Sequence, residues 1–163
     1  MKSNNLLVIG KDNDGIPRLI ESMFMVEGNP LEIDDDIIVF NPDGFDFKIV
    51  YVRYKSKEVL KSKVDLINIV FKRMTINVIW NCIDDSYTQK EVNWLYSLIK
   101  HNWAKSHVIQ VNIIESNEKE LDVEGKADIN VDLYKYIFDD FELDPRCFNH
   151  LYFATVTYSR ANN

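Results

Sequence analysis

Residues 6–17 read Leu-Leu-Val-Ile-Gly-Lys-Asp-Asn-Asp-Gly-Ile-Pro, and the fold prediction rests first on them. The apolar run from Leu6 to Ile9 has the length of a buried strand and ends at Gly10. Pro17 suits the first turn of a helix, because that turn leaves its backbone N–H groups without helical partners. Apolar residues at helical spacing follow it. The stretch therefore predicts a strand, a loop and a helix.

The next segment predicts an antiparallel hairpin. Two strand-like runs, Ile37 to Phe40 and Phe45 to Tyr54, are separated by Asn41-Pro42-Asp43-Gly44, whose proline and glycine suit a tight turn. Asp34 to Asp36 precede the first run, and charge of this kind discourages aggregation at a sheet edge. We therefore expect residues 37–40 to form an edge strand.

The rest of the chain alternates helical and strand-like patterns. The predicted elements are a helix over 56–74, a strand over 76–83, a helix from about Thr88 to Trp103, a strand over 108–114, a helix marked by residues 134–141 and a strand over 151–158. Such alternation is typical of a mainly parallel sheet with helices on both faces. We predict a single three-layer α/β domain over residues 1–163, with a six-stranded sheet in the order 2-3-1-4-5-6 and strand 2 antiparallel. No helix is predicted after the last strand, and the face left bare is a candidate partner or self-association site.

Composition excludes several classes of function. The net charge of −7 opposes nonspecific binding to nucleic acid or to an anionic membrane, because phosphate neutralisation needs a basic face. No apolar run is long enough to span a membrane, and residues 1–5 do not resemble a signal peptide, so we expect a cytoplasmic protein. Cys82, Cys147 and the three histidines lack the spacing of metal ligands, so no transition-metal site is predicted.

Charge is distributed unevenly along the chain. Residues 53–73 carry seven basic side chains against Glu58 and Asp65, whereas residues 115–144 carry eleven acidic side chains against three lysines. Such asymmetry favours protein contacts that are steered by charge. We predict a partner surface at Lys55, Lys57, Lys61 and Lys63. Its partner would be acidic, and residues 115–144 of a second copy are one candidate.

The chain resembles the Ras-like and Era-like small GTPase superfamily over almost its whole length. The matching residues are Leu6 to Gly10 with Gly15, Leu19, Ile20 and Phe24 for the phosphate loop and first helix, Val78 to Ile83 for the fourth strand, and Tyr152 to Thr155 for the Ser-Ala turn beside the guanine. The resemblance implies a P-loop GTPase fold. It also implies GTP or GDP with Mg²⁺ as the family's ligand.

The family's catalytic motifs are degenerate in this chain. Gly10 and Gly15 keep the spacing of G-x-x-x-x-G-K-[S/T], but Ile16 replaces the lysine and Pro17 replaces the hydroxyl residue that holds Mg²⁺. Asp12 and Asp14 add negative charge to a loop that should hold phosphates, and Lys11 is a poor substitute for the missing lysine.

Two further motifs of the family are also missing. D-x-x-G falls near Arg53-Tyr54-Lys55-Ser56, and N-K-x-D falls near Asn112-Ile113-Ile114-Glu115. We therefore predict a noncatalytic domain, a pseudoGTPase, that takes no cofactor and serves as a protein-interaction or structural module.

Two alternatives stay open at this point. The first is a GTP-binding protein or GTPase with an atypical site. The second is a Mg²⁺-dependent phosphohydrolase, because Asp12, Asp14, Asp84 and Asp85 all follow the carboxyl ends of strands, where open α/β sheets place their sites. The competing interpretation of these four residues is that they are loop and helix-capping aspartates.

Overall fold

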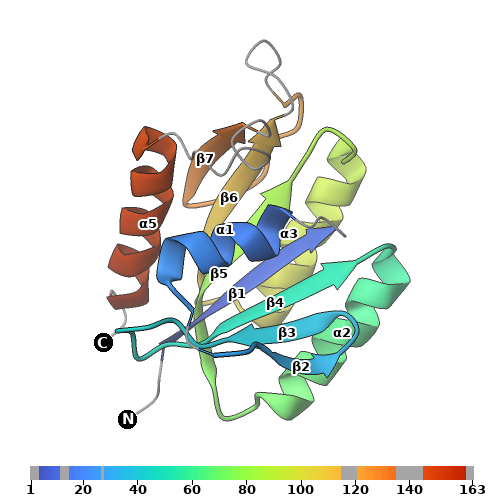
Figure 1. The fold of residues 1–163 in the computed structure, drawn as a ribbon. Helices are drawn as coiled ribbons and strands as arrows, with labels where there is room; N and C mark the ends of the chain where they lie inside the picture. The colour runs from blue at the N-terminus through green and yellow to red at the C-terminus, as the bar shows by residue number, and fades with distance from the viewer. Residues whose placement is uncertain (1–3, 12–14, 27, 115–120, 135–144, 161–163) are drawn as a thin grey trace.

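A seven-stranded sheet forms the centre of the molecule, with the strand order β2-β3-β4-β1-β5-β6-β7 (Figure 1). The computed structural model describes residues 4–11, 15–26, 28–114, 121–134 and 145–160. The strands are β1 (Asn4–Lys11), β2 (Leu31–Asp34), β3 (Ile37–Phe40), β4 (Ile49–Tyr54), β5 (Thr75–Ile83), β6 (His107–Ile114) and β7 (Ile129–Tyr134). The helices are α1 (Gly15–Phe24), α2 (Lys57–Val70), α3 (Gln89–Asn102) and α5 (Pro145–Arg160).

The sheet confirms the predicted fold class and corrects its strand count. β3 pairs antiparallel with β4, as predicted, and the five strands β4, β1, β5, β6 and β7 run parallel to one another. However, β2 pairs antiparallel with the outer side of β3, so residues 37–40 are not the edge strand. The sequence gives little sign of β2, because it has four residues and only half-buried or exposed side chains.

Helices cover both faces of the sheet (Figure 1). α1 and α5 lie on one face and α2 and α3 on the other, each pair over its own apolar core. α2 buries Leu60, Val64 and Ile67, which lie on one face of the helix. α3 begins at a capping box formed by Thr88 and Glu91. None of the described helices is both long and apolar enough to cross a membrane.

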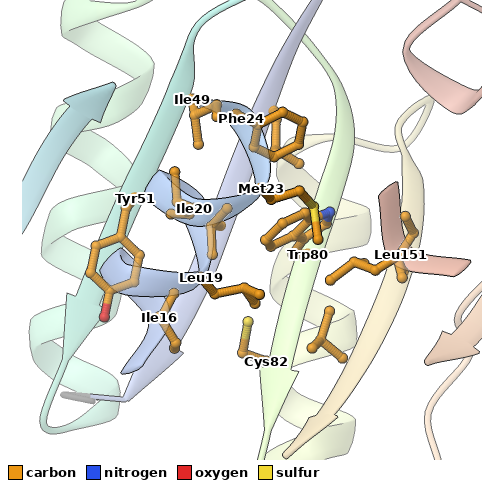
Figure 2. Packing of buried hydrophobic residues seen from close by; sticks show 14 of the residues in the cluster. Ile16, Leu19, Ile20, Met23, Phe24, Ile49, Tyr51, Trp80, Cys82 and Leu151 are labelled. Atoms are coloured by element: carbon orange, nitrogen blue, oxygen red, sulfur yellow. The ribbon is translucent and has the colours of Figure 1, made fainter. Parts of the chain in front are cut away.

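α1 is held by an apolar stripe that faces the sheet (Figure 2). Five of its ten residues are buried: Ile16, Leu19, Ile20, Met23 and Phe24. The ring of Phe24 lies 6.0 Å from that of Trp80, which is fully buried on β5. The first turn of the helix, where the family would bind phosphate, is therefore anchored in the core.

The carboxyl-terminal part of the chain differs from the prediction. Residues 151–158 were expected to form a strand, but they belong to helix α5. Their aromatic and β-branched residues favoured a strand, whereas the two buried ones, Leu151 and Thr155, are four apart and lie on one face of a helix. The last strand is instead β7, which alternates buried Val131 and Leu133 with exposed residues. The predicted helix over 134–141 falls mostly outside the described residues.

A closing helix is thus present where a bare face was predicted. The indole N–H of Trp80 donates to the hydroxyl of Thr155 at 2.9 Å, and that hydroxyl donates to the carbonyl of Leu151 at 2.7 Å. The side-chain amide of Asn77 donates to the carbonyl of Ser159 at 2.9 Å. α5 covers the face that was proposed for self-association, so that proposal is withdrawn.

Residues 121–128 run over the edge of α3, and Gly125 lets them approach closely. A Cβ atom on Gly125 would overlap the ring of Tyr96 and lie 2.5 Å from Oε1 of Gln110. The side chain of Gln89 binds Glu124, the residue that precedes Gly125. Its Nε2 donates to the carbonyl of Glu124 at 2.6 Å, and its Oε1 accepts from the Glu124 N–H at 2.9 Å.

Substitution of Gly125 by alanine should displace this segment. We expect Gly125→Ala to lower the free energy of unfolding by about 1–3 kcal/mol, the usual cost of overpacking. Chemical denaturation measures this loss. Lys126→Ala, an exposed neighbour, is the control and should change stability by less than about 0.5 kcal/mol. Equal stability of the two variants would contradict the packing of Gly125 against Tyr96.

Candidate functional site

The candidate site lies at the carboxyl ends of β1, β4 and β5, where open α/β sheets place their ligands. β1 ends with Gly10 and Lys11, β4 ends with Tyr54, and the turn after β5 contains Asp84 and Asp85. The amino terminus of α3 faces the same edge. Residues 12–14, with the predicted site residues Asp12 and Asp14, lie outside the described part of the chain.

Ile16 occupies the position of the family's phosphate-binding lysine. Its side chain is 1% exposed and packs in the core beneath α1 (Figure 2). A Cβ atom on Gly10 would lie 2.5 Å from Cδ1 of Ile16 and 3.5 Å from Cβ of Cys82. The absence of a side chain at Gly10 thus makes room for Ile16 itself. At position 16 the described structure therefore has an apolar side chain, with no group that could bind a phosphate.

Lys11 is directed toward α3. Its ammonium lies 3.0 Å from the carboxylate of Glu91, donates to the hydroxyl of Ser86 at 3.3 Å and sits 4.1 Å from the centre of the Tyr87 ring. Partial burial raises the pKa of Glu91, but the hydrogen bonds from Lys11 and Thr88, together with the charge of Lys11, outweigh it and keep the pKa below the usual value. The one cation of the degenerate loop is therefore already paired.

Two tyrosines fill the space behind Lys11. The hydroxyl of Tyr54 donates to that of Tyr87 at 2.8 Å, and Tyr87 also accepts from the backbone N–H of Lys11 at 3.2 Å. Burial raises the pKa of both tyrosines, so both stay neutral at physiological pH. The sequence prediction missed this pair together with Glu91. The only available signal was the place of Tyr87 just before the capping box, which does not reveal its partners.

The remaining aspartates of the predicted Mg²⁺ cluster do not converge on a cation site among the described residues. Oδ1 of Asp84 accepts from the backbone N–H and the hydroxyl of Ser86, at 2.9 and 2.5 Å, so this carboxylate supports the turn. Asp85 is exposed. Within the described part of the chain, no three histidine, cysteine or acidic side chains are grouped so that they could hold a metal ion.

The segments aligned with the family's other motifs have structural roles. The hydroxyl of Ser56 accepts from the N–H of Val59 at 3.3 Å and caps α2. The amide of Asn112 donates to Asp132 at 3.0 Å and accepts from Gln110 at 2.9 Å, so it joins β6 to β7. Residues 152–155 lie within α5, so their match to the guanine-binding turn was wrong.

The predicted partner surface is divided by contacts within the chain. Lys63 lies 2.7 Å from Asp34 and 3.4 Å from Asp36, which belong to the β2–β3 hairpin. Lys57 lies over the ring of Trp94, 5.4 Å from its centre. Lys55 and Lys61 are exposed. The structure thus brings Lys63 to an acidic group of its own chain and leaves two of the four lysines fully presented to solvent.

The charge pair between Lys63 and Asp34 shifts both pKa values in the stabilising direction. The hydrogen bond with Asp34 raises the pKa of Lys63. Partial burial alone would raise the pKa of Asp34, but hydrogen bonds from Lys63 and from the N–H of Asp36 hold it below the usual value. The pair is therefore charged throughout the neutral range and ties the hairpin to α2.

Lys63→Met should destabilise the protein by up to about 1 kcal/mol at neutral pH, a modest loss because water screens the partly exposed pair. The folded-state pKa of Asp34 is lowered, so the contribution is complete above the ordinary value of 3.8 and is lost as the pH falls through the folded-state value. Urea denaturation at several pH values should show the difference between wild type and variant closing in acid. Lys61→Met is the control, and an equal loss in both variants would contradict the assignment.

Comparison with known proteins extends the description of the fold. No protein-family model matches the chain, and no curated protein sequence matches it. Solved structures do match it. They include the FeoB G-domain from Methanococcus jannaschii, with a TM-score of 0.50 and 14% identity over 98% of this chain and 99% of that one. They also include the LeoA bacterial dynamin GTPase from ETEC, with a TM-score of 0.60 and 13% identity over 97% and 36% of the two chains, and the apo form of translation elongation factor SelB from Methanococcus maripaludis, with 0.57 and 12% over 99% and 36%. The chain has a GTPase-like fold. It spans about a third of the length of the LeoA and SelB chains, 36% in each case.

These matches correct the prediction that the chain takes no cofactor. The similar structures include a G-domain and a GTPase, so the fold implies guanine nucleotide with Mg²⁺, and the prediction of no cofactor was wrong. The described residues of the degenerate loop do not fit the triphosphate in the way the motif requires. Lys11 is paired with Glu91, Ile16 is buried, and Pro17 has neither a hydroxyl nor a backbone N–H. The fold thus implies a bound nucleotide, whereas the described residues of the loop lack the groups that would bind its phosphates.

Proposed function

We propose that the chain is a noncatalytic GTPase-like domain: a pseudoGTPase that does not hydrolyse GTP and that acts in the cytoplasm as a protein-interaction or structural module. The observation that carries the proposal is the arrangement of Lys11 and Ile16. Hydrolysis of GTP needs a cation at the terminal phosphates to stabilise the charge of the transition state. The cation of this loop faces a carboxylate 3.0 Å away, and the lysine position is apolar.

Guanine nucleotide is compatible with this proposal as a bound ligand. Binding and hydrolysis need different groups, and backbone N–H groups can hold an anion without a lysine. The second candidate function is a GTP-binding protein or GTPase with an atypical site, which the fold itself favours. A Mg²⁺-dependent phosphohydrolase is less well supported, because Asp84 is engaged by Ser86.

The test compares bound nucleotide with turnover. Nucleotide released from the denatured purified protein would be quantified by chromatography, and phosphate release from GTP would be followed with and without Mg²⁺. We expect no Mg²⁺-dependent release in the wild type or in Lys11→Met, and Lys55→Met is the matched control. Release that saturates with GTP and is lost only in Lys11→Met would overturn the proposal in favour of an atypical GTPase.

The proposed interaction surface includes the exposed lysines Lys55 and Lys61, with an acidic protein as partner. Lys63 is a poor target for testing it, because its replacement also breaks the contact with Asp34. Lys55→Glu combined with Lys61→Glu reverses charge without removing a described contact. We expect the double variant to lose salt-sensitive partner binding and to keep the thermal stability of the wild type. Unchanged binding would remove these two lysines from the proposed surface.

A further inference from the structure

The end of α2 presents two apolar side chains to solvent. Ile69 is 71% exposed and Val70 is 46% exposed. Single exposed apolar residues are ordinary on protein surfaces. Here, however, two β-branched residues are adjacent, and the exposed Lys72 and Arg73 follow them after the half-buried Phe71. The segment combines apolar area with positive charge at one end of the molecule.

The end of α3 adds charge to the same region. Nδ2 of Asn68 donates to Oδ1 of Asn102 at 2.9 Å, so the last turns of α2 and α3 are in contact. Lys105, which is exposed, lies just after the end of α3. We call the combined surface the basic-apolar patch, and its members are Ile69, Val70, Lys72, Arg73 and Lys105.

Local structure accounts for only part of this patch. Cations near the last turn of a helix interact favourably with its dipole, which explains the position of the lysines. The dipole does not explain two exposed β-branched residues. The sequence has no acidic residue over 66–83 or over 92–114, so Glu58, Asp65 and Glu91, the acidic residues of α2 and α3, all precede the segments that carry the patch. The complementary partner is therefore an acidic segment with apolar side chains.

The chain contains one segment of that composition. Residues 135–144 read Lys-Tyr-Ile-Phe-Asp-Asp-Phe-Glu-Leu-Asp, with four acids among five aromatic or aliphatic residues. Acidic groups would face the cations of the patch, and apolar side chains would cover Ile69 and Val70. Charge complementarity of this kind steers association and fixes orientation, while burial of apolar area supplies affinity.

We propose that residues 135–144 of one copy bind the basic-apolar patch of a second copy. Within one chain the segment cannot reach the patch. β7 ends at Tyr134 and α5 begins at Pro145, both at the carboxyl edge of the sheet, whereas α2 and α3 end at the opposite edge (Figure 1). A ten-residue connection that starts and ends at the same edge can extend at most about 17 Å from that edge, half its full length. A nine-residue strand such as β5 spans about 30 Å.

The contact is therefore head to tail. One end of each copy binds the opposite end of the next, so the assembly forms a ring if the rotation closes and grows into a filament if it does not. This gives the interaction module of the proposed function a partner. It fails or succeeds independently of the claim about hydrolysis, because its test involves no nucleotide.

The experiment uses the full chain and a fluorescein-labelled peptide with the sequence of residues 135–144. Fluorescence anisotropy would measure peptide binding at 50 and 300 mM salt, and sedimentation velocity would measure self-association. We expect the peptide to bind, with an affinity that falls as salt rises. Ile69→Ser with Val70→Ser, and separately Lys72→Glu with Arg73→Glu, should each weaken binding at least tenfold. Both pairs are exposed, so thermal unfolding should stay within a few degrees of the wild type.

Matched controls decide the outcome. Lys90→Glu with Lys126→Glu carries the same charge change at exposed lysines outside the patch and should alter peptide affinity by less than twofold. Equal binding of a scrambled peptide, or equal weakening by the control pair, would overturn the proposal. So would a monomer at every concentration with no peptide binding. Binding of the chain to phosphatidylserine vesicles that is lost in the patch variants, without peptide binding, would overturn it in favour of a membrane surface.

Discussion

Ile16→Lys should lower the free energy of unfolding by about 3–5 kcal/mol, although it restores the lysine of the GTPase phosphate loop. The reason is the position of Ile16, which is 1% exposed and packs against Gly10 and the core beneath α1. A lysine there must either stay neutral or pull the first turn of α1 away from the sheet. The loss of the isoleucine packing adds to the cost.

The pH dependence of this loss identifies its cause. Burial without a partner lowers the folded-state pKa of a lysine, so the penalty is largest below that value and shrinks as the pH rises toward the unfolded value. Chemical denaturation at pH 7 and at pH 10 would show the variant recovering relative to the wild type. Ile16→Val keeps the apolar character and should cost only about 0.5–1.5 kcal/mol. A lysine at position 16 that costs no more than valine would mean that residue 16 reaches solvent, which would contradict its burial beneath α1.

Trp80→Ala should have a comparable effect, with a loss of about 3–5 kcal/mol. Trp80 is fully buried on β5 and lies between α1 and α5, in contact with the ring of Phe24 and bonded to the hydroxyl of Thr155. Its removal leaves a large cavity and takes the indole donor away from Thr155. The hydroxyl of Thr155 keeps its bond to the carbonyl of Leu151, so α5 itself should remain helical.

Denaturation curves for Trp80→Ala and Trp80→Phe separate the two contributions. Phenylalanine keeps most of the apolar volume and loses the hydrogen bond, so it should cost about 1–3 kcal/mol. Amide hydrogen exchange would show whether the loss falls on the face that α1 and α5 cover, because α2 and α3 pack over a separate core. Equal protection of the two faces in Trp80→Ala would contradict this division of the molecule.

The pattern of apolar residues in the sequence predicted the central strand β5 and helices α2 and α3 well. It failed for strand β2 and for residues 151–158 of helix α5. Strand β5 is a long apolar run without alternation, and helices α2 and α3 have apolar residues at helical spacing, with a capping box at the start of α3, so several signals agreed. The prediction for residues 151–158 was wrong because their residue types favour a strand, whereas the positions of their buried residues follow a helix. β2 failed because four half-buried or exposed residues have almost no pattern, and it forms by pairing with β3.

The sequence could predict which phosphate-binding groups the site lacks, but not which contacts replace them. Ile16 and Pro17 show in the sequence that the phosphate loop lacks its lysine and hydroxyl. The partners of Lys11 could not be read in the same way, because Glu91 lies eighty residues along the chain and meets Lys11 only when α3 packs against β1. The pairing of Lys63 with Asp34 was hidden for a similar reason. The basic residues of 53–73 suggested an external partner, and tertiary packing supplies an internal one.

The ion pairs of Lys63 with Asp34 and Asp36 determine whether nucleotide or solution conditions control the shape of the surface formed by α2 and the β2–β3 hairpin. In a GTPase, the segments on either side of the third strand change their arrangement with the bound nucleotide. Here fixed charges of the chain itself join the hairpin to α2, at 2.7 and 3.4 Å. Ionic strength and acidity act on such a joint directly, and a ligand with no contact to it cannot shift its equilibrium. We therefore expect a recognition surface with the same shape in every nucleotide state, which a partner could bind continuously and leave only when the solution conditions change.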